Sequence, residues 1–203
     1  DASFREFYRL KKNNSSSIIV NAKKDKYKNL IVYTVVNNIL NSHKINAPKF
    51  LSNHIKNNMI EISDLGEKSF YDHVVRKKNK LSDYKLLINL LIKIQKIKTK
   101  PQYKLGTNKV KIMKYSLSNL HKESDLFFDW YLKYTMKKKN VSKIKKTLRA
   151  ELNNIYKKLK IKDDTFVHRD FHVSNIMYYK KKLGVIDSQD ALIGNPLYDV
   201  ASL

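Results

Sequence analysis

Short strand-like runs of hydrophobic residues dominate the first third of the chain. Such runs occur at residues 4–10, 17–21, 48–52 and 58–63. Polar turns separate them, but from about residue 25 to residue 43 hydrophobic residues recur every three or four positions instead. That spacing predicts one helix between the second and third strands.

Beyond Gly66 the hydrophobic spacing becomes helical. We expect Ser82 to cap a helix that ends before Pro101, because a serine side chain accepts a hydrogen bond from the first helical turn. Two further helices are predicted at about residues 123–138 and 142–162.

Together these elements predict an α+β protein with two lobes. A small β-rich lobe would cover residues 1–65 and a larger, mainly helical lobe residues 66–203, with a hinge at residues 63–66. A cleft between two lobes is a common place for a cofactor. The chain begins at Asp1 inside a strand-forming region and ends at Leu203 on an apolar run, so we expect the fold to be truncated at both ends.

The composition of the 203 residues, with 42% hydrophobic and 30% charged residues, is typical of a globular protein. No stretch approaches the roughly 18 uninterrupted apolar residues of a membrane span. The sequence has no cysteine, which excludes disulfides and thiolate metal sites and fits a reducing compartment. We therefore expect a cytoplasmic protein that does not enter a membrane.

The formal net charge of +24 comes from 42 Lys and Arg against 18 Asp and Glu. Such a charge attracts nucleic acids without regard to their sequence. Most of the basic residues are lysines spread along the chain, however, whereas base recognition favours arginine and a local patch. We expect solvated lysine surfaces and no specific nucleic-acid partner, with a nucleic-acid-binding module as the alternative.

The segment from residue 166 to residue 187 carries the candidate chemistry. Two apolar runs, at 176–179 and 183–186, flank three lysines and predict a β-hairpin. If Lys181 is the centre of the loop, Asn175 pairs with Asp187, and opposed residues lie about 4.5–5.5 Å apart. Their amide and carboxylate oxygens would then suit Mg²⁺, which takes its other ligands from water and phosphates.

Asp170 precedes this hairpin and would face a substrate hydroxyl. Phosphoryl transfer from ATP needs a carboxylate to orient that hydroxyl and metal ions to neutralise the phosphates. The spacing of Asp170, Asn175 and Asp187 therefore favours a kinase that uses ATP and Mg²⁺. The alternative is that both aspartates are ordinary turn residues.

Residues 168–175 and 184–187 resemble the catalytic and metal motifs of the aminoglycoside phosphotransferase and choline kinase-like superfamily. This resemblance implies a protein-kinase-like fold. Protein kinases follow the metal aspartate with Phe-Gly, whereas this sequence continues with Ser188 and Gln189, which favours the branch that acts on small molecules.

Four further segments resemble bacterial cell-wall amino-sugar kinases, which phosphorylate N-acetylmuramate or N-acetylglucosamine at the anomeric hydroxyl. They are residues 1–5, 62–66, 123–131 and 186–203. The resemblance implies a small-molecule sugar substrate and a role in peptidoglycan recycling.

Carried onto this sequence, the resemblance makes Asp170 the catalytic base and Asn175 and Asp187 the metal ligands. Asp199 matches a structural aspartate of the family and is expected to brace the catalytic loop or to cap a helix.

The resemblance also implies a nucleotide site in the first lobe. Backbone groups of Ser63, Asp64 and Leu65 would bind adenine. Ser3 and Arg5 would contact the phosphates, in a loop that lacks the usual glycines.

The sequence departs from the kinase pattern in the residues that would hold the phosphates. Kinases hold the α- and β-phosphates with a strand Lys paired to a helix Glu. Here the second strand has no internal Lys, and no Glu lies between Glu6 and Glu61. The candidates to replace them are Lys23 or Lys24 with Asp25, or alternatively Arg5.

The sequence is also compatible with other functions. An aminoglycoside or choline kinase is one alternative, although polycationic aminoglycosides need an acidic pocket and the basic composition argues against them. A nucleotide-binding pseudokinase is another. The oligomeric state is not determined by the sequence.

Overall fold

The computed structural model describes residues 5–13, 15–22, 27–136, 138–158, 164–179 and 182–203. No helix within these ranges combines the length and the hydrophobicity that crossing a membrane requires.

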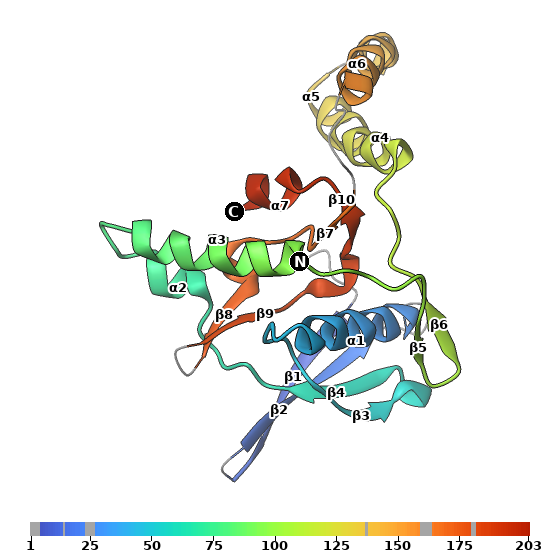
Figure 1. The fold of residues 1–203 in the computed structure, drawn as a ribbon. Helices are drawn as coiled ribbons and strands as arrows, with labels where there is room; N and C mark the ends of the chain where they lie inside the picture. The colour runs from blue at the N-terminus through green and yellow to red at the C-terminus, as the bar shows by residue number, and fades with distance from the viewer. Residues whose placement is uncertain (1–4, 14, 23–26, 137, 159–163, 180–181) are drawn as a thin grey trace.

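The first part of the chain forms a four-stranded antiparallel sheet (Figure 1). The strand order is β1-β2-β4-β3, and the strands are β1 (Arg5–Lys12), β2 (Ser15–Ala22), β3 (Phe50–His54) and β4 (Met59–Ser63). Helix α1 (Tyr27–Ser42) lies between β2 and β3 in the chain and packs on the sheet. The predicted succession of strands and helix is confirmed, although β1 and β2 extend into the expected polar turn.

The second part combines helices with short strand pairs. Its helices are α2 (Phe70–Val74), α3 (Leu81–Gln95), α4 (Leu117–Leu126), α5 (Lys133–Thr135), α6 (Lys138–Lys158) and α7 (Leu197–Ser202), with a π-helical stretch at Phe127–Leu132. Its strands pair as β5 (Tyr103–Leu105) with β6 (Asn108–Val110), β7 (Thr165–Val167) with β10 (Leu192–Gly194), and β8 (Ile176–Tyr179) with β9 (Lys182–Val185). In Figure 1, α4, α5 and α6 form an arm that projects from the rest of the molecule.

Several helix starts differ from the sequence-based expectation. Helix α3 starts at Leu81, whose amide donates to the Asn79 side chain at 3.0 Å, so Ser82 lies inside the first turn and does not cap the helix. Helix α4 starts before residue 123, because Ser116 caps it by accepting from the amide of Asn119. The expected start at residue 142 is also wrong, since α6 already begins at Lys138.

A continuous hydrophobic core links the two parts of the chain. Buried residues of α1, such as Ile39 and Leu40, belong to the same cluster as Phe70, Leu91 and Phe166 from the second part. A smaller cluster lies between α1 and the sheet and contains Val20, Ala22, Leu30, Tyr33, Ile60 and Ile62. Helix α1 therefore contributes to both clusters, and the division of the chain after residue 65 remains a prediction.

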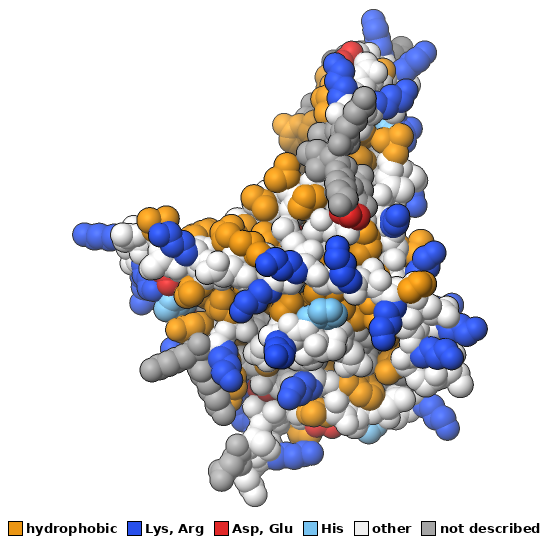
Figure 2. Space-filling view, viewed as in Figure 1, with side chains coloured by type: hydrophobic (Ala, Val, Ile, Leu, Met, Phe, Trp, Pro, Cys, Tyr) orange, Lys and Arg blue, Asp and Glu red, His pale blue; other side chains and the backbone are white. Residues whose placement is uncertain are grey.

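Lysine and arginine side chains are scattered over the face shown in Figure 2. They occur on the arm, along α3 and over the lower part of the molecule. On this face they do not gather into one patch, which agrees with the expectation of dispersed, solvated lysines.

The shared core predicts that damage to α1 destabilises the whole molecule. Leu40→Ala removes a wholly buried side chain and should lower the free energy of unfolding by about 2–5 kcal/mol. Leu51→Ala, at a position that is 52% exposed in β3, is the matched control and should change it little. Urea unfolding followed by far-UV circular dichroism measures both, and equal effects of the two substitutions would contradict the shared core.

Candidate active site

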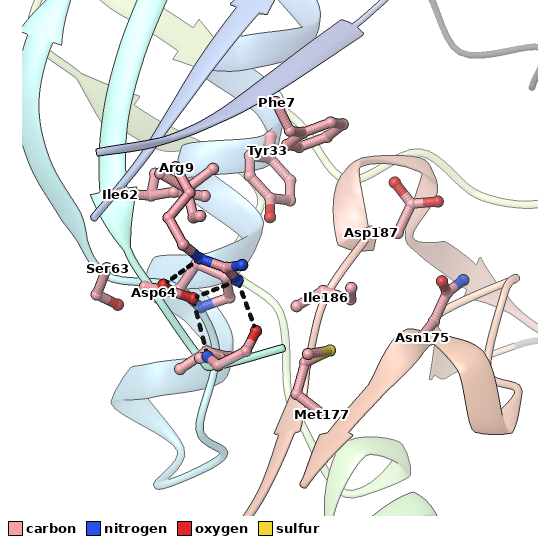
Figure 3. Close-up of a pocket in the computed structure, with 14 residues that line it drawn as sticks. Phe7, Arg9, Tyr33, Ile62, Ser63, Asp64, Asn175, Met177, Ile186 and Asp187 are labelled. Atoms are coloured by element: carbon pink, nitrogen blue, oxygen red, sulfur yellow. Dashed lines mark hydrogen bonds and ion pairs between the residues drawn. The ribbon is translucent and has the colours of Figure 1, made fainter. Parts of the chain in front are cut away.

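A cavity of about 380 Å³ opens between the N-terminal sheet and the β8–β9 hairpin (Figure 3). Its apolar walls include Ile18 and Ile62 from the sheet and Met177 and Ile186 from the opposite side. In Figure 3, Ser63 and Asp64 lie at one end of the cavity and Asn175 and Asp187 at the other. A cavity with apolar walls and polar groups at both ends has the form of a cofactor site.

The hinge after β4 forms one end of this cavity, to which Ser63, Asp64 and Leu65 all contribute. The Ser63 amide donates to the carbonyl of Lys49 at 2.8 Å, and the Asp64 carboxylate accepts from the Gly66 amide at 2.8 Å. The predicted hinge residues thus line the cavity together. The Asp64 side chain, however, fixes the backbone instead of pointing to a ligand.

Arg9 of β1 anchors the hinge, a role that was not predicted from the sequence. Its Nε lies 2.7 Å from Asp64 and its Nη1 2.9 Å from Glu67. Burial tends to raise the pKa of Asp64, but the hydrogen bond from Arg9, with others from Ser16 and Gly66, outweighs it, so that this pKa is lowered. No local pattern reveals this ion pair, because its partners lie 55 residues apart.

The loop after β7 carries Asp170 and is closed by hydrogen bonds within itself. The amides of His172 and Asn175 donate to the carbonyls of Asp170 and His172, respectively. The side-chain amide nitrogen of Asn175 also donates to the Asp170 carbonyl, at 3.1 Å. Since its nitrogen is engaged there, Asn175 offers its amide oxygen to a ligand in the cavity.

The predicted pairing of Asn175 with Asp187 is wrong by one residue. Tyr179 pairs with Lys182, and continuing this register places Asn175 opposite Ile186, whose amide donates to the Asn175 carbonyl at 3.0 Å. The loop between the strands therefore has two residues instead of three. A shift of one residue turns a side chain to the other face of a strand.

Asp187 nevertheless reaches the cavity that Asn175 lines. Its backbone adopts φ 61° and ψ 38°, a left-handed conformation that turns the chain at the end of the hairpin. Backbone geometry therefore brings the two predicted metal ligands to one cavity, where strand pairing alone would not.

Negative charge accumulates around Asp170. Burial raises the pKa of Asp170, and the carboxylates of Asp187 and Asp190 raise it further. The positive charge next to Asp187 belongs to Arg5, whose Nη2 lies 2.6 Å from the Asp187 carboxylate. The Asp187 carboxylate is thus already paired with a positively charged group.

The donor atoms fit Mg²⁺, which prefers carboxylate and amide oxygens. Across the described residues, no three His, Cys, Asp or Glu side chains are arranged to hold a metal ion by themselves. An ion held by Asn175 and Asp187 would thus complete its coordination with water and phosphate oxygens, as Mg²⁺ does in nucleotide sites.

Asp199 braces the loop that carries Asp170, as expected. Its wholly buried carboxylate accepts hydrogen bonds from the amides of His168 and Arg169, at 2.7 and 2.9 Å. Burial raises the pKa of Asp199 to about 6, although these hydrogen bonds favour the charged form.

Arg169 connects the catalytic loop to the arm. Its Nη2 lies 2.6 Å from the carboxylate of Glu123 in α4, and its guanidinium carbon lies 5.9 Å from the ring centroid of Tyr115. The Tyr115 hydroxyl donates to the same carboxylate, and Tyr198 approaches it at 3.4 Å. This cluster joins residues that are far apart in the sequence, and periodicity and spacing gave no signal for it.

Some predicted nucleotide contacts lie outside the described residues. These are Ser3 and the suggested clamp residues Lys23, Lys24 and Asp25. Arg5 is described and lies 5.6 Å from the ring centroid of Tyr33, a buried residue of α1 that lines the cavity. Burial raises the pKa of Tyr33 to about 12, so its hydroxyl stays neutral beside Arg5.

The sequence profile described as "Phosphotransferase enzyme family" matches residues 3–203. The chain belongs to this family. The segments that resemble the motifs of this phosphotransferase family, residues 168–175 and 184–187, lie in the loop after β7 and at the end of the β8–β9 hairpin. Both segments are next to the cavity described above.

Two relatives of this phosphotransferase-family chain are described as N-acetylmuramate/N-acetylglucosamine kinases. The chain is 25% identical to the one from Neisseria meningitidis serogroup B and 26% identical to the one from Pseudomonas aeruginosa. Both alignments cover 100% of this chain but only 58% and 57% of the relatives. The chain thus spans less than two thirds of their length.

Solved structures confirm the predicted protein-kinase-like α+β fold. The ternary complex of APH(2″)-IIa with streptomycin and ATP matches with a TM-score of 0.63 and 14% identity, over 96% of this chain and 69% of that one. The choline kinase LicA from Streptococcus pneumoniae matches with a TM-score of 0.63 and 14% identity, over 97% and 64%.

Burial of His168 predicts a specific loss of stability in acid. Both ring nitrogens are buried without a hydrogen-bond partner, and burial lowers the pKa of His168 from 6.5 to about 4. The unfolded chain therefore binds a proton more readily, and stability falls as the pH drops from 6.5 towards 4. Between pH 7 and 4.5, the free energy of unfolding should therefore fall by roughly 2–3 kcal/mol less for His168→Leu than for the unmodified protein.

Urea unfolding at the two pH values measures this difference. His54→Leu, which replaces an exposed histidine of β3, serves as the control and should preserve the pH dependence of the unmodified protein. Parallel stability curves for His168→Leu and the unmodified protein would show that the buried imidazole is not responsible.

Proposed function

We propose that this protein transfers the γ-phosphoryl group of ATP to a hydroxyl of a small molecule. The observation that carries the proposal is the convergence of Asn175 and Asp187 at one end of an apolar cavity, beside the loop that carries Asp170. The apolar walls suit a nucleotide base, and the polar end suits its phosphates.

Asp170 is the proposed catalytic base. Its carboxylate would orient the acceptor hydroxyl and take its proton as the phosphoryl group leaves ADP. The neighbouring carboxylates and burial raise the pKa of Asp170, which makes it a stronger base towards that proton. Asn175 and Asp187 would hold Mg²⁺, which neutralises charge on the phosphates when it is bound.

Adenine is assigned to the hinge backbone at Ser63, Asp64 and Leu65. The amide of Ser63 already donates to Lys49, so we assign the amide donor for the base to Asp64 or Leu65. We further propose that Ser3 and Arg5 contact the phosphates, with Arg5 replacing the usual strand lysine.

The acceptor is proposed to be a cell-wall amino sugar, phosphorylated at its anomeric hydroxyl during peptidoglycan recycling. The descriptions of the two relatives support this choice. The net charge of +24 is compatible with the carboxylate of N-acetylmuramate and unfavourable for polycationic aminoglycosides. A need for ATP and the absence of cysteine agree with a cytoplasmic reaction.

A panel of acceptors tests this proposal. ADP release by the whole protein should depend on N-acetylmuramate or N-acetylglucosamine and should not respond to aminoglycosides or choline. ADP release only with choline or an aminoglycoside, and not with the amino sugars, would show that the proposed acceptor is wrong. Nucleotide binding without turnover of any acceptor would indicate a pseudokinase.

Replacing the proposed base should abolish most of the activity without unfolding the protein. Asp170→Asn keeps the size of the side chain but cannot accept the proton, so we expect kcat to fall about 10²–10⁴-fold. Glu151→Gln, which neutralises an exposed carboxylate of α6, is the control and should retain activity. A coupled assay of ADP formation measures kcat for both variants. A normal kcat for Asp170→Asn would exclude Asp170 as the catalytic base.

The charge around Asp170 predicts how the rate depends on pH. Asp190 is exposed, and its carboxylate raises the pKa of Asp170. Asp190→Asn should therefore lower that pKa and move the acidic limb of the kcat/KM profile to lower pH, because the base must be ionised to act. The shift should shrink in high salt. A limb that stays in place at low salt would mean that Asp170 does not control it.

A further inference from the structure

Arg5 pairs with Asp187, one of the two proposed metal ligands. Its side chain is only 10% exposed, and its two terminal nitrogens lie 2.6 Å from Asp187 Oδ1 and 2.5 Å from Gln189 Oε1. The rings of Phe7 and Tyr33 flank the guanidinium, with their centroids 5.7 and 5.6 Å from its central carbon. A guanidinium bound by oxygens and aromatic faces is held firmly in one place.

This position conflicts with metal binding at the same carboxylate. Mg²⁺ binds oxygen at about 2.0–2.1 Å, and a second cation already lies against the Oδ1 atom of Asp187. The two positive charges would repel each other strongly at such a separation. Arg5 and a metal ion would therefore compete for Asp187.

Arg9 provides a useful comparison on the same strand. Its guanidinium is engaged by Asp64, Glu67 and the Gly66 carbonyl, at the opposite end of the cavity. Those contacts belong to the hinge and do not involve Asn175 or Asp187. Of these two arginines of β1, Arg5 is thus the one whose partner is a proposed metal ligand.

We propose that Arg5 is an internal counter-ion that pairs with Asp187 while no nucleotide is bound, and that it exchanges Asp187 for a phosphate when Mg²⁺ and ATP bind together. This inference rests on the proposed function, because it takes Asp187 as a metal ligand. The exchange keeps the guanidinium paired with an anion in both states, and a phosphate offers it the same two-pronged geometry as a carboxylate.

The exchange makes binding of metal and nucleotide cooperative. A metal ion alone has to displace Arg5 without offering it a new partner. Only the fraction of molecules in which Asp187 is free of Arg5 can then bind the metal, and the apparent affinity for the metal falls in proportion to that fraction. Metal with nucleotide supplies both the cation for Asp187 and the anion for Arg5. Arg5 therefore opposes binding of the metal alone and favours binding of the nucleotide.

Mn²⁺ binding in the absence of nucleotide tests the first half of this claim. Arg5→Met removes the guanidinium but retains an unbranched, apolar side chain, and it should tighten Mn²⁺ binding by about tenfold, as measured by electron paramagnetic resonance. Arg149→Met removes an arginine that is paired with Asp125 on the arm, and it controls for the loss of one charge from a total of +24. Unchanged or weaker Mn²⁺ binding by a folded Arg5→Met protein would overturn the proposal.

Nucleotide binding tests the second half, with the opposite sign. Calorimetry with a non-hydrolysable ATP analogue and Mg²⁺ should show weaker binding by Arg5→Met, while Arg149→Met binds as the unmodified protein does. If Arg5 had a purely structural role, Arg5→Met would weaken the binding of both Mn²⁺ and the nucleotide. Equal or tighter nucleotide binding by Arg5→Met would also overturn the exchange.

Asp187→Asn separates this inference from the proposed function. If Asp187→Asn loses Mn²⁺ binding but Arg5→Met leaves it unchanged, only the role of Arg5 is wrong. If Asp187→Asn binds Mn²⁺ as the unmodified protein does, the metal assignment itself is wrong, and both proposals fall.

Discussion

The buried carboxylate of Asp199 organises the site, because it accepts hydrogen bonds from two successive backbone amides, those of His168 and Arg169. A buried amide without a partner is costly, so these bonds determine the path of the loop as it leaves β7. Arg169 has a φ of 77°, a conformation that such bonds help to maintain. Asp170 follows directly, and its position depends on this brace.

Charge is the second constraint on the site. Burial and the carboxylates of Asp187 and Asp190 raise the pKa of the proposed base, Asp170, and Arg5 provides the positive charge next to Asp187. Carboxylates this close repel each other unless a cation lies among them. The arrangement therefore suits chemistry in which a metal ion and a polyanionic nucleotide enter together, as phosphoryl transfer requires.

The arm and the hinge are tied to this centre by ion pairs over long sequence distances. Glu123 of the arm binds Arg169 next to Asp170, and Arg9 of β1 binds Asp64 at the opposite end of the cavity. Each pair joins a separate structural element to a residue beside the proposed nucleotide or acceptor site. The Arg169–Glu123 pair is partly buried and the Arg9–Asp64 pair is exposed, and both are charge-assisted hydrogen bonds that hold these elements against the site.

The sequence by itself determined the features that depend on neighbouring residues. Hydrophobic spacing was sufficient for the four strands of the sheet and for α1, while the spacing of Asp170, Asn175 and Asp187 revealed the candidate chemistry. The three-residue strands such as β5 and β7 were missed, because so few residues show no periodicity.

Only the tertiary structure decided the register of the β8–β9 hairpin, which depends on which backbone groups pair. It also placed Arg5 against Asp187, 182 residues away, since no local pattern encodes a contact between distant segments that packing alone brings together.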